Sequence, residues 1–168
     1  SPPWYPTAAS PPDGRHEQDK HGPRAITHQL VSVIDFGGTK YFATVADSAS
    51  DPDPRVRADV MSTLGSIFGV GDPPRALAIL IAGTRDPAPE VRGAAVAALG
   101  SSHDETVTDL LVARTDDTDR RVRFWAAWSL ARRPGLHVRA ALGRLAADAD
   151  ADVRDAGRAV LELPTRSL

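Results

Sequence analysis

Three large aromatic residues, Phe124, Trp125 and Trp128, lie in one short stretch of the sequence. Such side chains supply much of the binding energy at protein interfaces, because they remove large apolar surfaces from water. If the stretch is a helix, Phe124 and Trp128 lie one turn apart and face away from the core, and Trp125 lies at its margin. The stretch therefore predicts a binding site. Packing inside the protein or against its N-terminal segment is the alternative.

Residues that commonly catalyse reactions or hold metals form no recognisable motif. The sequence has no cysteine, which excludes disulfides, thiolate metal sites and a cysteine nucleophile. The serines lack a G-x-S-x-G context, and a metal-binding spacing is missing among His16, His21, His28, His103 and His137. Two acidic clusters have calcium-loop spacing without the loop glycine or the distal glutamate, and helix capping explains them better: Asp116, Asp117 and Asp119, and Asp148, Asp150 and Asp152. We therefore expect no catalytic residue, no metal and no cofactor.

The charge balance narrows the class of partner. The chain of 168 residues has 20 basic and 22 acidic residues, without the excess of base expected of a domain that binds phosphate backbones. It has no apolar run long enough for a transmembrane helix, and its first residues show no basic segment followed by an apolar stretch. We expect a cytoplasmic protein that binds a protein or peptide rather than a nucleic acid or a membrane. Its oligomeric state stays open.

Four segments of the chain share one pattern. Each has an aspartate five positions before a Val-Arg pair and a leucine eight positions after the valine. The segments begin at Asp51, Asp86, Asp117 and Asp148, and read DPDPRVRADVMSTLG, DPAPEVRGAAVAALG, DTDRRVRFWAAWSLA and DADADVRDAGRAVLE. A recurring period of this length indicates a repeat architecture, in which each unit buries its apolar side against its neighbours.

Each unit has the apolar spacing of a helix that buries one side. In the second unit Val91, Ala95 and Leu99 fall on one stripe of a helix. Aspartate and proline before the stripe suit a helix N-terminus, and Gly65 and Gly100 suit its end. The pattern predicts helices over residues 54–66, 89–100, 120–132 and 151–162, with a second, more variable helix between successive units over residues 74–83, 105–114 and 136–147.

The pattern D-x-x-x-x-V-R-x-x-A-x-x-A-L-G resembles the HEAT-like repeats of the phycobilisome-lyase type, over about residues 39–164. The resemblance implies an all-α fold: a right-handed α-solenoid of about four HEAT-like helix pairs, with the second helix of each pair lining the concave surface. It also implies a polar ladder between repeats, made by Asp51, Arg57, Asp86, Arg92, Asp117, Arg123, Asp148 and Arg154.

The N-terminal third departs from the repeat. Residues 1–24 are rich in proline and predict an extended or disordered arm, in which Trp4 and Tyr5 stand out as a possible docking pair. Residues 25–50 predict a degenerate capping repeat, either helical or a hairpin, ahead of the solenoid over residues 51–168. The hairpin alternative rests on Asp35, Gly37, Gly38, Thr39 and Lys40, which resemble the D-x-G-G-T-K hairpin of sugar kinases. That match is short, and the chain lacks the two large lobes of that fold.

We therefore expect a non-catalytic scaffold that binds a protein or peptide on the concave face of the solenoid. The predicted contact residues are Phe124, Trp125, Trp128, Met61, Val96, Asp59, Asp155 and Arg158. One alternative is a lyase-like or chaperone-like protein that acts on a small aromatic or tetrapyrrole-like ligand in the same groove. Another is a DNA-binding helical-repeat protein of the glycosylase type, against which the acidic balance speaks.

Overall fold

The computed structural model describes residues 38–67, 73–102, 104–131 and 133–163 of the chain. The predicted arm and the first part of the capping repeat lie outside these residues. The elements are α2 (Gly38–Asp47), η1 (Ser48–Ser50), α3 (Pro54–Ser66), α4 (Pro73–Gly83), α5 (Pro89–Leu99), η2 (Glu105–Val107), α6 (Thr108–Arg114), α7 (Arg120–Ser129), α8 (Leu136–Leu145) and α9 (Ala151–Glu162). Within the described ranges all regular structure is helical, which confirms the all-α prediction. None of the helices in these ranges is both long and apolar enough to cross a bilayer.

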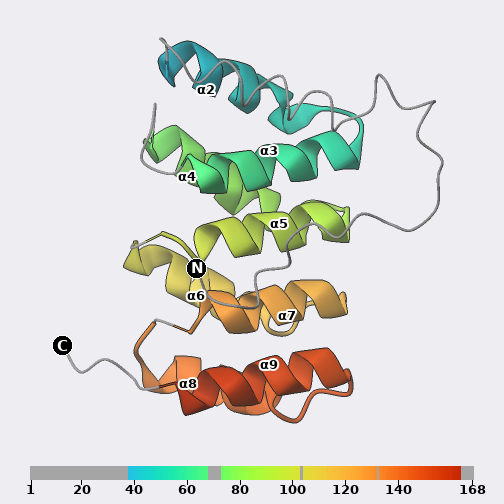
Figure 1. Cartoon of the computed structure of the whole chain (residues 1–168), viewed down its shortest axis with the longest axis vertical. Helices are drawn as coiled ribbons and strands as arrows, with labels where there is room; N and C mark the ends of the chain where they lie inside the picture. Colours follow the sequence, from blue (N-terminus) through green and yellow to red (C-terminus); the bar gives the residue numbers. More distant parts are fainter. Residues whose placement is uncertain (1–37, 68–72, 103, 132, 164–168) are drawn as a thin grey trace, which may run out of the picture.

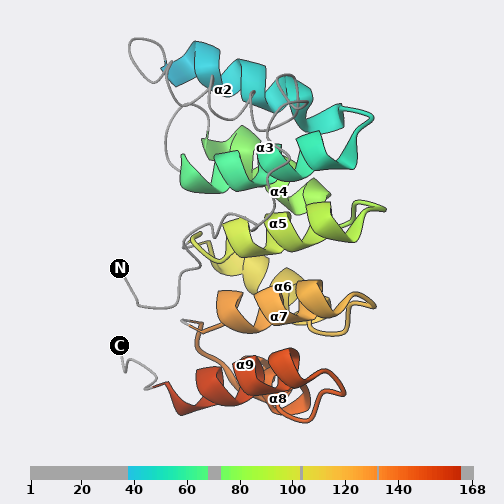
Figure 2. The same cartoon turned by 45° about the vertical axis from the view of Figure 1, so that its right-hand side comes forward.

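The helices form two layers. Helices α3, α5, α7 and α9 stack in one column, and α4, α6 and α8 lie behind them (Figures 1 and 2). Each helix of the second layer packs on the helix that follows it in the chain, so that α4 with α5, α6 with α7, and α8 with α9 are three successive repeats. The chain is therefore an α-solenoid of stacked helix pairs.

The apolar stripe of each unit forms the core between the layers. Val91, Val122 and Val153 have no exposed surface, and Leu64 and Leu99 are equally buried. The buried side chains of successive repeats join in one continuous cluster, so no repeat completes its core alone.

The first described helix decides between the two structures predicted for residues 25–50. Phe42, Val45 and Ala46 are buried, with the spacing of a helix that turns one side to the core. Helix α2 begins at Gly38, inside the D-x-G-G-T-K motif. The hairpin alternative is therefore wrong from this residue onward, and Asp35 and Gly37 lie outside the described residues.

Two glycines at predicted helix ends also lie at close contacts between helices. Gly100 is the C-terminal cap of α5, as predicted, and α3 ends at Ser66, one residue after Gly65. A Cβ atom on Gly65 would lie 2.7 Å from the Cβ of Ala98, and one on Gly100 would lie 2.8 Å from the hydroxyl of Ser129. These glycines therefore allow neighbouring helices of the first layer to approach closely.

Arginine–aspartate pairs join successive repeats along one edge of the first layer. Each arginine makes two parallel hydrogen bonds to the aspartate of the next repeat: Arg57 to Asp86 (both 2.8 Å), Arg92 to Asp117 (3.0 and 2.8 Å) and Arg123 to Asp148 (2.8 and 2.9 Å). The remaining nitrogen of each donates to two backbone carbonyls of its own repeat. The paired side chains are at most 18% exposed. Each pair therefore fixes both the spacing and the rotation of two repeats.

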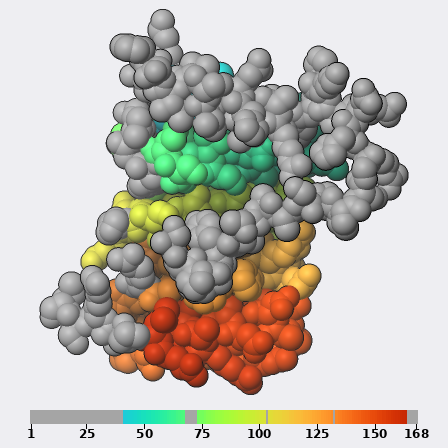
Figure 3. All heavy atoms as spheres, viewed as in Figure 1, coloured from blue at the N-terminus to red at the C-terminus, as the bar shows by residue number. Residues whose placement is uncertain are grey.

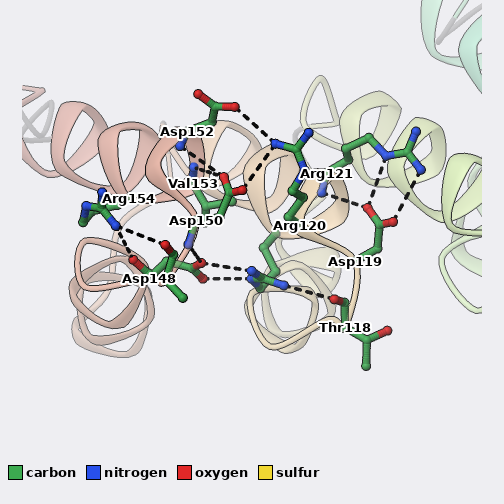
Figure 4. Close-up of polar contacts among 11 residues, drawn as sticks. Thr118, Asp119, Arg120, Arg121, Asp148, Asp150, Asp152, Val153 and Arg154 are labelled. Atoms are coloured by element: carbon green, nitrogen blue, oxygen red, sulfur yellow. Dashed lines mark hydrogen bonds and ion pairs between the residues drawn. The ribbon is translucent and has the colours of Figure 1, made fainter.

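The last arginine of this series has a different environment. Arg154 donates to the carbonyls of Asp148 and Ala149, as its counterparts do in their own repeats (Figure 4). Among the described residues no carboxylate pairs with it. Asp51, at the other end, accepts a hydrogen bond from the backbone of Asp53 and has no arginine side chain on its carboxylate within the described chain.

The outer face of α9 also differs from those of the preceding helices. On the face that meets the next helix, positions two, five and nine after the repeat valine hold small or apolar residues in α3, α5 and α7. In α9 they hold Asp155, Arg158 and Glu162, and all three are exposed. A charged outer surface of this kind is typical of the terminal repeat of an array.

The ladder predicts that acid destabilises the protein. Hydrogen bonds from Arg57 hold the pKa of Asp86 below its usual range, and those from Arg123 do the same for Asp148, although burial acts in the opposite direction. The stabilisation is therefore complete above the pKa of an unfolded aspartate, about 4, and is lost as the pH falls through the lower pKa of the folded state. Urea unfolding between about pH 6 and about pH 2 measures this loss. Equal stability across that interval would contradict the prediction.

Candidate functional site

A groove lies between α7 and α9 on the solvent side of the first layer, with a cavity volume of about 640 Å³. We call it the aromatic groove, and its lining residues are Arg120, Arg121, Phe124, Trp125, Trp128, Asp150, Asp152, Val153, Asp155, Ala156 and Ala159. The surfaces of α7 (orange) and α9 (red) lie next to each other on the face viewed in Figure 3. The three predicted aromatic residues therefore share one surface depression.

The relative exposure of the three aromatic side chains differs from the prediction, in which Phe124 and Trp128 face away from the core and Trp125 lies at its margin. Trp125 is 40% exposed, whereas Phe124 and Trp128 are half-buried and pack against the core. The ring of Phe124 meets those of Trp125 and Trp128 edge to face, with centroids 5.4 and 6.4 Å apart. Phe124 thus holds both indoles in place, and Trp125 offers the largest free apolar surface.

Small residues on the neighbouring helices provide the space for these rings. A Cβ atom on Gly93 of α5 would lie 3.6 Å from the indole of Trp125, so this ring lies across a helix with no side chain at that point. On the other side, α9 has Ala156 and Ala159 where α7 has Trp125 and Trp128. The depression therefore arises from large residues on one helix next to small residues on the next.

The charged residues of the groove differ in whether they already have partners. Arg120 donates to Asp150 (3.3 Å) and Asp152 (3.2 Å), as Figure 4 shows. Arg121 pairs with Asp119, the residue that caps its own helix, at 3.4 Å. Asp155 is exposed and has no hydrogen bond or ion pair with any described residue. The charge of both arginines is thus balanced within the protein, and one carboxylate remains available.

The structure brings together only part of the predicted contact set. Asp155 lies in the groove with the three aromatic residues, and Arg158 is exposed on α9 outside its lining. Met61 is 2% exposed and Val96 is fully buried, so the prediction that they contact a partner is wrong. Both lie five residues after the repeat valine, a position that the next repeat covers. Asp59 lies on α3 and does not line the groove.

The sequence interpretation missed the other half of the groove. Four of its lining residues had not been singled out: Arg120, Arg121, Ala156 and Ala159. Asp150 and Asp152 had been named only as acids that suit helix capping. The available signal was the comparison between adjacent repeats: alanines in the fourth repeat at the positions of the tryptophans in the third.

The charged carboxylate of Asp59 destabilises the folded protein, so we expect its replacement by a neutral residue to increase stability slightly. Burial raises its pKa, and the nearby charge of Asp53 raises it further. The charged form is therefore disfavoured in the folded state, and stability increases as the pH falls toward the raised pKa. We expect Asp59→Asn to raise the free energy of unfolding at neutral pH by about 0.5 kcal/mol. Urea unfolding at neutral and acidic pH checks this, and a gain that persists unchanged in acid would contradict the proposed cause.

The side chains of the groove combine an apolar surface with charged groups. Within the described residues, no three side chains of histidine, cysteine, aspartate or glutamate are placed to hold a metal ion. Its carboxylates pair with arginines or face solvent. The arrangement can remove an apolar side chain from water and pair with a charge.

Comparison with known proteins gives the following similarities. A family profile described as HEAT repeats matches residues 77–162. No curated protein matches the chain. A chain from the complex of CpcE and CpcF of phycocyanin lyase from Nostoc sp. PCC7120 is similar in structure, with a TM-score of 0.67 and 24% identity over 84% of this chain and 92% of that one. A designed armadillo repeat protein in complex with the peptide (KR)4 is similar with a TM-score of 0.54 and 19% identity, over 86% of this chain and 77% of that one. At these identities the two structures support the solenoid fold.

Proposed function

The chain belongs to the HEAT repeat family, and from this premise we propose that it is a non-catalytic scaffold that binds a protein or peptide segment in the aromatic groove. The observation that carries the proposal is the exposure of Trp125, 40% of whose surface is free although α7 packs on both of its neighbours in the first layer. Removing such a ring from water on binding supplies a large favourable free energy.

The shape of the groove supports an extended segment. It is open to solvent along two adjacent helices, and it combines apolar rings with charged residues, most of which lie at the N-terminal ends of α7 and α9. A combination of apolar and polar surface is the usual composition of a protein interface. Two structurally similar proteins are described with partners of this class: CpcE with CpcF, and a designed armadillo repeat protein with a peptide.

The likeness to a chain of the phycocyanin lyase complex supports a second candidate. In it, the groove holds a small aromatic or tetrapyrrole-like ligand, which the rings of Trp125 and Trp128 would stack against. Titration with a soluble tetrapyrrole such as biliverdin, followed by its absorption spectrum, separates the two: a saturable shift that Trp125→Ala abolishes favours this candidate. A duplex DNA partner is disfavoured by the three aspartates that line the groove against two arginines.

The proposed function predicts the effect of Trp125→Ala. Peptides selected from a random display library on the wild-type protein should bind the variant about tenfold more weakly, a loss of about 1.4 kcal/mol. The matched control is Leu136→Ala, which removes a side chain that is 87% exposed on α8, in the other layer. Calorimetric titration measures both affinities, and urea unfolding checks that each variant is folded. Selected peptides that bind wild type and Trp125→Ala equally would place the site elsewhere on the solenoid.

A further inference from the structure

The unpaired carboxylate in the groove determines which sign of charge a bound ligand can carry. Five charged side chains line it: Arg120, Arg121, Asp150, Asp152 and Asp155. The first four are occupied by intramolecular ion pairs, either with one another or, for Arg121, with Asp119. Asp155 alone has no partner among the described residues. The charge left available to a ligand is therefore negative.

The aromatic rings, like the free carboxylate, favour a positively charged ligand. The face of an indole is the negative pole of its quadrupole and attracts ammonium and guanidinium groups. Trp125 has the exposed area for such a contact, and Asp155 lies on the opposite wall of the same groove. An aromatic surface beside a carboxylate complements a side chain with an apolar stem and a cationic end, which are the features of arginine and lysine.

We propose that the aromatic groove recognises a basic residue within an otherwise apolar peptide segment, with the stem of that residue on Trp125 and its cationic end paired with Asp155. This inference rests on the proposed function and names the chemistry of its ligand. The fit accounts for both walls of the groove: the rings of α7 remove the stem from water, and the carboxylate of α9 balances the charge that would otherwise lose its hydration.

A set of capped nine-residue peptides tests the proposal. The peptides have the sequence GSALXLAGS, in which X is Arg, Lys, Gln or Glu, and their dissociation constants are measured by calorimetric titration. With the wild-type protein we expect the Arg and Lys peptides to bind about tenfold more tightly than the Gln peptide, and the Glu peptide to bind more weakly still. The preference for Arg over Gln should fall to about twofold in Asp155→Asn.

A matched control and a second variant keep the outcomes distinct. Asp109→Asn removes an exposed carboxylate from α6, in the other layer, and should leave the preference unchanged. If Trp125→Ala weakens all four peptides equally and the central residue has no effect in wild type, the groove binds peptides but the proposed recognition of a cation is wrong. If Trp125→Ala changes none of the affinities, or none of the peptides binds at millimolar concentration, both this inference and the proposed function are overturned.

Discussion

Replacement of Arg123 by methionine is expected to lower the free energy of unfolding by about 3 kcal/mol, the lower end of the loss seen when one partner of a buried ion pair is removed. Methionine keeps much of the apolar stem, so the change removes mainly the charge and the donors. Asp148, whose side chain is 11% exposed when paired with Arg123, would then keep only its hydrogen bond from the backbone of Asp150. Unfolding in urea, monitored by circular dichroism at neutral pH, measures the loss.

Arg154→Met is the matched control for this substitution. Arg154 donates to the carbonyls of its own repeat in the same way as Arg123, but has no carboxylate partner among the described residues. Its replacement should therefore cost less than about 1 kcal/mol. The difference between the two variants isolates the contribution of the pair across the repeat boundary. Equal losses would mean that the bonds within each repeat, rather than the inter-repeat pairs, stabilise this edge of the solenoid.

Replacement of Gly157 by alanine is expected to lower the free energy of unfolding by about 2–3 kcal/mol. The added Cβ atom would lie 2.7 Å from the backbone nitrogen of Ala146 and 2.8 Å from the carbonyl carbon of Leu145. Both are backbone atoms at the end of α8, so α8 and α9 must move apart to accommodate it. The movement would disturb the core around Leu145, which is 2% exposed. Thermal unfolding measures the change in Tm.

The same substitution in the adjacent helix, Gly143→Ala, is expected to have the opposite effect on stability. Gly143 is exposed in α8, and an added Cβ atom would have no other atom within 4 Å. Alanine has a higher helix propensity than glycine by up to about 1 kcal/mol, so this variant should be more stable than wild type. If Gly157→Ala also stabilised the protein, the result would contradict the prediction that α9 packs too tightly on α8 to accommodate an added Cβ atom.

The sequence predicted the helices of the first layer well because their apolar residues repeat in register. Val91, Val122 and Val153 mark the same point of three helices, and all three are fully buried. The predicted ends were less accurate. Helix α7 ends at Ser129, three residues before the predicted end, and its cap at Leu130 donates to carbonyls of the last turn. Helix ends depend on which backbone groups find hydrogen-bond partners nearby, and the spacing of apolar residues gives no information about those hydrogen bonds.

The binding site was predicted in part, and the errors have one physical origin. A helical projection places residues around one helix but does not show which sides its neighbours cover. Met61 and Val96 fall outside the main stripe, yet the next repeat buries them. Trp125 was placed at the margin of the core and is instead the most exposed ring, because Gly93 leaves it resting on the surface of α5.

Arg133 is another feature that the sequence did not predict, because it lies outside the repeat pattern. It donates to the carbonyls of Leu99, Ser102 and Asp104 and to the hydroxyl of Thr108. These acceptors come from α5, the segment that follows it and the start of α6, so Arg133 ties two successive repeats together. The sequence gives no sign of this, because its acceptors are mainly backbone carbonyls and leave no pattern of residue types.

The charged face of α9 has a consequence for how an array of this kind can lengthen. A copy of the third repeat added after α9 would set its helix against Asp155, Arg158 and Glu162, and would bury three charges that have no counterparts in α7. A copy of α4 and α5 inserted between α5 and α6 would instead present a glycine to Trp125 again, and it would find Arg92 before it and Asp117 after it to continue the inter-repeat pairs. Gene duplications inside the array are therefore tolerated at once, whereas growth at this end needs substitutions first.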